Sequence, residues 1–135
     1  MLENPKINIK IKLAALWTSA LFCYIYGDYF QLYTPDKVNS LISGDNTLNS
    51  PVTLLIASIV MAIPSVMIAG SILLKPGLNR ILNIVFGTLF TIMMVAIGIY
   101  STHEWYLFYV FLAFLESIIT ALIVWHAWKW PKTVL

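Results

Sequence analysis

The sequence predicts an all-α, polytopic membrane protein that folds as a bundle of four transmembrane helices, one membrane domain covering residues 1–135. Of its 135 residues, 60% are hydrophobic and only 10% are charged, and the mean hydropathy is +0.85. Soluble domains average about 45–50% apolar and about 25% charged residues. This composition excludes an ordinary soluble enzyme and a disordered chain. The net charge of +2 is too small to indicate a nucleic-acid partner.

Four segments are long and apolar enough to cross the ~30 Å hydrocarbon core, which takes roughly 20 residues. These segments are residues 13–33, 52–74, 81–101 and 105–130. Ser50 and Pro51 are typical of a helix N-cap followed by proline in the first turn, and they mark the start of the second span. Lys75-Pro76-Gly77 predicts a short turn between the second and third spans.

The longest loop, between the first two spans, contains a weak helical pattern. Val38, Leu41 and Ile42 recur at helical spacing between Pro35 and Gly44. This spacing predicts a short amphipathic helix over residues 35–43 that lies on the membrane surface. The alternative is a solvated loop with three incidental apolar residues.

The basic residues are distributed unevenly between the two sides of the predicted bundle. Seven of the eight lie on the side of the N-terminus, and only Lys37 lies on the opposite side. The seven are Lys6, Lys10, Lys12, Lys75, Arg80, Lys129 and Lys132. By the positive-inside rule, this split predicts that both the N- and the C-terminus are cytoplasmic.

Two acidic residues lie inside the predicted spans. Glu116 is eleven residues into the fourth span, roughly 16 Å deep and close to the bilayer midplane. Asp28 is about 7 Å below the outer end of the first span. Because a carboxylate at the bilayer centre costs about 2.5–3.5 kcal/mol, such residues usually face a cavity or a partner. We expect both acids to face one outward-open cavity; alternatively, Glu116 is a structural residue and Asp28 belongs to a hydrated rim.

Helical spacing indicates which residues accompany the acids. Tyr24 and Gln31 share a stripe with Asp28, and Tyr109 and Thr120 share one with Glu116. A third stripe of small and polar residues contains Asn83. The predicted ligand-binding residues are therefore Asp28, Glu116, Tyr24, Tyr109, Gln31, Thr120 and Asn83. Such stripes are equally typical of close packing and hydrogen bonding between membrane helices.

Pro64 falls near the middle of the second span, at nearly the depth of Glu116. Proline lacks a backbone N–H, so the carbonyl of Val60 loses its usual helical donor. The resulting kink is a candidate hinge, or a device that opens a pocket. The alternative is an ordinary proline, since this residue is frequent in membrane helices.

Signals for metal or nucleophile chemistry are weak. The single cysteine, Cys23, excludes an internal disulfide and a cysteine-based zinc site. His103 precedes the fourth span and lies far from His126 near its cytoplasmic end, and no metalloprotease, nucleophile-elbow or phosphate-loop motif is present. We therefore expect no metal and no cofactor.

Four groups of residues form a recognisable pattern along the chain. They are Tyr24-x-Tyr26-x-Asp28, Ile63-Pro64, Asn79-Arg80-x-x-Asn83-Ile84, and Glu116 with Thr120, Trp125, Ala127, Trp128, Lys129, Trp130 and Pro131. The pattern resembles a family of small four-helix bacterial integral membrane proteins known only as a domain of unknown function. The resemblance implies the four-helix fold and a multi-pass location in the bacterial inner membrane, and no activity. In that family a glutamate often precedes the Ile-Pro step; here Ala62 stands there, so this chain does not need that carboxylate.

Three functions fit these features. The favoured hypothesis is a non-catalytic bundle, alone or as a homo-oligomer, that binds a lipid or a lipophilic or cationic small molecule in an aromatic and acidic cavity. The second is a small proton-coupled transporter that uses Glu116 or Asp28. Small multidrug-resistance transporters are similar in size, but they carry their essential acid in the first helix. The third is a membrane-embedded isomerase or reductase. It is the least favoured, because this chain has no paired histidine and acid at helical spacing to act as acid and base.

Overall fold

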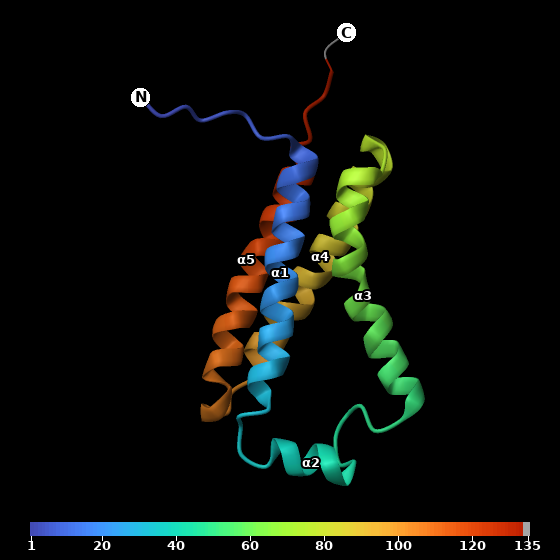
Figure 1. Ribbon diagram of the computed structural model, residues 1–135, viewed down its shortest axis with the longest axis vertical. Coiled ribbons are helices and arrows are strands. Elements are labelled where there is room, and N and C mark those ends of the chain that lie inside the picture. The colour runs from blue at the N-terminus through green and yellow to red at the C-terminus, as the bar shows by residue number, and fades with distance from the viewer. Residues whose placement is uncertain (134–135) are drawn as a thin grey trace.

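The protein is all-α, and its four longest helices are each apolar and long enough to cross a membrane, which confirms the predicted fold class (Figure 1). The computed structural model describes residues 1–133, and no strand occurs among them. The elements are α1 (Ile9–Gln31), α2 (Lys37–Ser43), α3 (Pro51–Leu73), α4 (Pro76–Tyr100), the 3-10 turn η1 (Glu104–Tyr106) and α5 (Leu107–Trp128).

Helix α1 begins at Ile9, before the predicted start at residue 13, and ends at Gln31 rather than at residue 33. The early start has a local cause, because the side chain of Asn8 accepts a hydrogen bond from the N–H of Lys10 (2.8 Å) and caps the helix. The prediction began the span at the first residue after the lysines, so it counted only the apolar part of the helix.

The connection from α3 to α4 is tighter than predicted. Helix α3 ends at Leu73 and α4 already begins at Pro76, where residue 81 was expected. Proline is favoured in the first helical turn because its missing N–H has no partner there anyway. At the start of α3, Ser50 and Thr53 form the capping box, each side chain accepting from the other residue's N–H at 3.2 Å.

The helices pack so that α1 lies against both α5 and α3, while α4 packs along α5 (Figure 1). Both termini lie at one end of the bundle with the α3–α4 turn, and α2 lies at the opposite end, hereafter the α2 end (Figure 1). The fully buried core includes Leu13, Trp17, Phe90 and Ile123, from α1, α4 and α5. These residues pack the half of the bundle that is nearer the termini.

Basic side chains close helix ends at the terminal end of the bundle. The Lys10 ammonium donates to the carbonyl of Leu74 (2.9 Å) just beyond α3. The Arg80 guanidinium donates to the carbonyls of Ala127 (3.1 Å) and Trp128 (3.3 Å) at the end of α5. Both side chains place positive charge where the unpaired carbonyls of a helix concentrate negative charge, which stabilises the helix ends.

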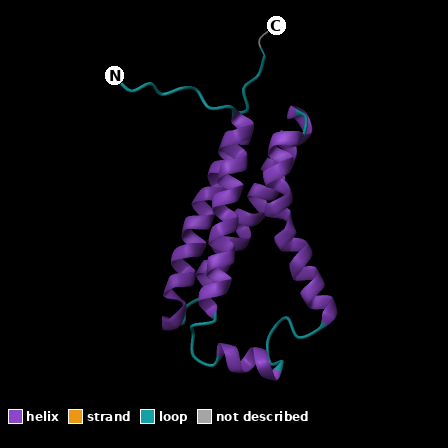
Figure 2. Cartoon of the chain, viewed as in Figure 1, coloured by secondary structure: helices purple, strands orange, loops and turns teal. Residues whose placement is uncertain are grey.

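Helix α3 bends near its middle, and its N-terminal half leaves the bundle (Figures 1 and 2). Its buried residues are Pro64, Met67 and Ser71, so none lies before Pro64. The proline ring clashes with the carbonyl one turn earlier and opens the helix on the proline side. Because Pro64 faces the bundle, residues 51–63 lean away from the other helices.

A short helix, α2, does occupy the long loop, from Lys37 to Ser43 (Figure 2). Its apolar residues Val38, Leu41 and Ile42 are all exposed. Gly44 ends it in the left-handed conformation, with φ 78°. Its apolar side chains pack into no core of the described chain.

Candidate functional site

A cavity of about 250 Å³ lies between α1, α3, α4 and α5 and brings together both membrane acids. Asp28 and Tyr24 reach it from α1, and Glu116 and Tyr109 reach it from α5. Four of the seven predicted ligand-binding residues therefore line one cavity. The acids were predicted at different depths, and the cavity is long enough along the helices to contain both.

Glu116 is the most deeply placed charged group of this cavity, with 4% of its surface exposed. Thr120 Oγ1 donates a hydrogen bond to the backbone carbonyl of Glu116 (3.0 Å). No side-chain hydrogen bond or ion pair among residues 1–133 engages its carboxyl group. A carboxyl left unpartnered beside a cavity is free to bind a ligand, a proton or a cation.

Tyr24 supplies a second unpartnered polar group. Its side chain is 5% exposed, and its ring packs against Phe90 with the centroids 5.7 Å apart. Its hydroxyl is buried and has no hydrogen-bond partner in the described part of the chain. Because buried polar groups are nearly always satisfied, this unpaired hydroxyl makes Tyr24 a candidate ligand-binding residue of the cavity.

Asp28, Tyr109 and Gln31 lie nearer the α2 end of the cavity. Asp28 is exposed, and Lys37 of α2 is near enough to interact with it electrostatically without forming an ion pair. The side chain of Gln31 lies beside the Tyr109 hydroxyl. Gly27 packs against the Tyr109 ring, and a Cβ there would lie at an ordinary contact distance of 3.5 Å from it. Asp28 and Tyr109 line this end of the cavity, and Gln31 lies beside it.

The remaining walls are apolar, and sequence reasoning missed them. Helix α4 contributes Met93, Met94 and Ile97. The N-terminal half of α3 contributes Ala57, Val60 and Met61, which lie at i, i+3 and i+4 on one helix face. That spacing could have suggested a shared face, but apolar residues surround these positions on most sides of the helix, so little contrast marked the face.

Asn83 does not line the cavity, contrary to the prediction. Its Oδ1 accepts from the indole N–H of Trp17 (2.8 Å), and its amide group donates to Oδ1 of Asn79 (2.7 Å). Asn79 in turn donates to the carbonyl of Ser71 (2.7 Å). All four residues are completely buried. Because the polar atoms of Asn83 are satisfied within the chain, its role is to join α1, α3 and α4.

Thr120 is also a packing residue rather than part of the cavity wall. Its hydroxyl lies 2.7 Å from that of Thr91, which links α5 to α4. The residue is completely buried. The small-residue interpretation of these stripes therefore holds for both Thr120 and Asn83.

Comparison with protein-family models matches residues 4–135 to a family of unknown function, DUF6326. The chain belongs to this family. The membership confirms the resemblance expected from the helix motifs. No curated protein and no solved structure matches the chain.

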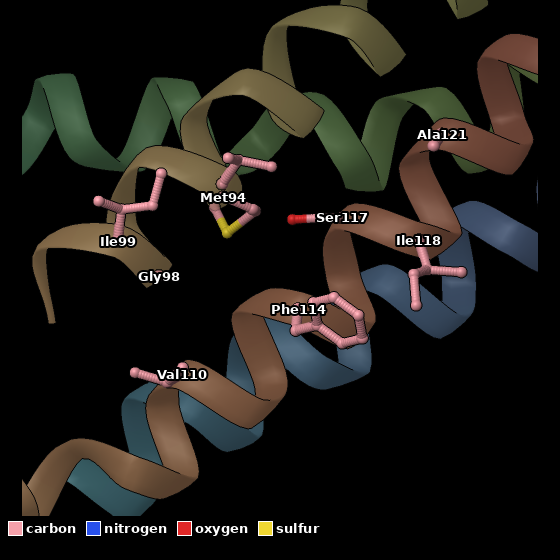
Figure 3. Close-up of a pocket in the computed structure, with 9 residues that line it drawn as sticks. Met94, Gly98, Ile99, Val110, Phe114, Ser117, Ile118 and Ala121 are labelled. Atoms are coloured by element: carbon pink, nitrogen blue, oxygen red, sulfur yellow. The ribbon is translucent and has the colours of Figure 1, made fainter. Parts of the chain in front are cut away.

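Another cavity of this DUF6326 protein, of about 470 Å³, lies between α4 and α5 (Figure 3). Apolar side chains such as Met94, Val110 and Phe114 line it. Its one polar side chain is Ser117, whose hydroxyl donates to the carbonyl of Ala113 (2.7 Å). With no free polar group, this surface can fix neither the orientation nor the chemistry of a ligand.

Within the described residues of the DUF6326 chain, no three histidine, cysteine or acidic side chains are close enough together to hold a metal ion. His103 precedes η1 at the α2 end, whereas His126 lies in the last turn of α5 at the terminal end. Neither lines the cavity with Glu116. The chemistry of the cavity therefore depends on two carboxyl groups and two phenol hydroxyls.

Proposed function

We propose that the protein binds an amphiphile, with its polar head at Glu116 and its apolar part along the separated half of α3. The proposal is carried by the unpartnered carboxyl of Glu116 and the unpartnered hydroxyl of Tyr24, which line one cavity. Burying such polar groups in an apolar interior without hydrogen-bond partners costs free energy, so a polar ligand group there would stabilise the protein.

The cavity dimensions suit a head group rather than a whole ligand. About 250 Å³ is below the roughly 300–1,000 Å³ of typical small-molecule sites. The walls made by Ala57, Val60 and Met61 belong to the half of α3 that leans away from the bundle. An acyl or alkyl chain can therefore leave the cavity between α1 and α3 and remain in contact with lipid.

We further infer that the termini are cytoplasmic and that the cavity is accessible from the outer side of a bacterial inner membrane. The distribution of lysine and arginine supports this orientation, because the basic residues cluster at the terminal end. The buried residues Leu13, Trp17 and Ile123 and the Asn83 network lie at that same end, which supports closure of the cavity towards the cytoplasm.

Calorimetry in lipid nanodiscs tests amphiphile binding, with decanol as a neutral probe. Ala57→Phe fills the cavity and is expected to reduce decanol affinity at least tenfold. Ala69→Phe is the matched control, because Ala69 is exposed on the same helix and lines no wall of the cavity. Equal affinities of the two variants and the parent, or the absence of saturable binding, would contradict the proposal.

A proton-coupled transporter is the second candidate, and the bend of α3 at Pro64 favours it. A helix whose halves pack differently against the bundle can open and close a cavity by movement about one residue. Such a protein should accumulate ethidium in proteoliposomes under an imposed pH gradient, and Glu116→Gln should abolish this uptake. Uptake no greater than in protein-free liposomes would exclude transport of this cation while leaving binding intact.

A further inference from the structure

The unpartnered groups of the cavity also constrain the chemistry of the head group. Glu116 offers carboxyl oxygens that accept hydrogen bonds, and the Tyr24 hydroxyl can accept as well as donate. No basic side chain lines the cavity in the described part of the chain, and Lys37 faces Asp28 only at the rim. A complementary ligand must therefore supply N–H or O–H donors and positive charge.

The bend in α3 adds an acceptor to the same wall. The carbonyl of Val60 has no helical donor, because the residue one turn later is Pro64. Val60 lines the cavity, and it lies one turn from Pro64 on the face of α3 that Pro64 turns towards the bundle. An ammonium group with three N–H bonds matches a carboxyl, a hydroxyl and a carbonyl as acceptors.

We propose that the head group is a protonated primary amine, a conclusion that rests on the proposed amphiphile binding. The phenol rings of Tyr24 and Tyr109 favour a cation near their faces. The three methionines that line the cavity are uncharged and do not oppose a cation. A quaternary ammonium has no N–H and would leave the Tyr24 hydroxyl and the Val60 carbonyl unpaired. An anionic head would meet two acids and no balancing cation. A neutral alcohol would supply one donor and no charge.

The test compares ligands of equal chain length in nanodiscs of phosphatidylcholine, by calorimetry at constant ionic strength. Decylammonium is expected to bind about tenfold more tightly than decyltrimethylammonium. Its affinity should exceed that of decanol by more than tenfold. Equal affinities of the two cations would overturn the primary-amine proposal. Binding of decanol that Ala57→Phe abolishes would then still support amphiphile binding, so the two failures are distinguishable.

Variants of the cavity sharpen the comparison. Tyr24→Phe should weaken decylammonium binding several-fold and leave decyltrimethylammonium unchanged, whereas Glu116→Gln should weaken both cations and spare decanol. Tyr26→Phe is the control, because Tyr26 is exposed and lines no wall of the cavity. A Tyr24→Phe protein that keeps the full preference for the primary amine would contradict the assignment, and this variant retains the ring that packs on Phe90.

Two sources could supply a primary ammonium, namely a free alkylamine or the head group of phosphatidylethanolamine. Replacing part of the phosphatidylcholine by phosphatidylethanolamine separates them. If the lipid is the occupant, the apparent affinity for decylammonium falls as the phosphatidylethanolamine fraction rises, and Glu116→Gln removes this competition. If the affinity is independent of lipid composition, the ligand is a free amine.

Discussion

Asn83 and Glu116 are both buried polar residues, yet their side chains have opposite hydrogen-bonding states. Asn83 is fully engaged by Trp17 and Asn79. The Glu116 carboxyl is engaged by no side chain of residues 1–133 and faces a cavity. Helical spacing placed both residues on interior stripes but carries no information on partners in other helices. The sequence therefore identified the buried polar residues but could not separate structural ones from those of a site.

Asn83→Ala is expected to lower the free energy of unfolding by about 1–2 kcal/mol, because Trp17 and Asn79 lose a buried partner. Unfolding in a titration with sodium dodecyl sulfate measures this. Ser58→Ala is the control, since Ser58 is exposed and bonds only to the carbonyl of Leu54 in its own helix. If both variants unfold alike, the Asn83 network does not stabilise the bundle.

Glu116→Gln should behave in the opposite way and leave stability unchanged or increased. The substitution removes an unpartnered ionisable group from an apolar setting and breaks no side-chain hydrogen bond within residues 1–133. The same unfolding titration measures the change, without added ligand. A loss comparable to that of Asn83→Ala would show that the acid is structural.

At the scale of the helices, two positions decide how the bundle is built. Gly87 allows α4 to approach α5, and Pro64 separates the halves of α3. Both residues were visible in the sequence, and the Pro64 kink was predicted with its chemical cause. The direction of the bend could not be predicted, because it depends on which helix face is buried, and the serines of α3 occur on both exposed and buried positions (Ser58 and Ser65 exposed, Ser71 buried).

Gly87→Ala is expected to destabilise the protein by about 1–3 kcal/mol through overpacking. The new Cβ would lie 2.8 Å from Cγ2 of Val124 and 3.4 Å from the backbone carbonyl oxygen of Thr120. The carbonyl is part of helix α5, so it cannot move aside without shifting the helix. Gly98→Ala is the matched control in the same helix, because its nearest neighbour, Ala113, would be at an ordinary 3.5 Å. Equal effects on the unfolding midpoint would contradict a special role for Gly87.

Pro64→Ala is expected to straighten α3 and bring residues 51–63 closer to α5, because it restores an N–H donor for the Val60 carbonyl. Spin labels at Leu55 and Phe111, both exposed, report the distance by pulsed electron resonance in a Cys23→Ser background. Pro76→Ala, which changes a proline in the first turn of α4, should leave the distance unchanged. An unchanged distance in Pro64→Ala would show that packing, rather than the proline, holds the helix apart.

The whole molecule is asymmetric along its length, and this asymmetry was only partly predictable. The number of spans, the short loop helix and the separation of charges all follow from hydropathy and lysine positions. The convergence of Asp28, Tyr24, Tyr109 and Glu116 on one cavity depends on how α1 rotates against α5. That rotation depends on packing between helices distant in the sequence, such as Gly27 of α1 beside Tyr109 of α5, which no single-sequence pattern reveals.

Orientation in the membrane follows from the same asymmetry, and matched single cysteines test it. In a Cys23→Ser background, Thr47→Cys lies in the exposed α2–α3 connection and Thr133→Cys lies beyond α5, near the opposite end. Because seven of the eight basic residues are on the side of the termini, a membrane-impermeant thiol reagent should label Thr47→Cys in intact cells. It should label Thr133→Cys only after lysis. The reverse pattern would place the cavity mouth on the cytoplasmic side, and labelling of both cysteines in intact cells would indicate dual insertion, which the charge bias opposes.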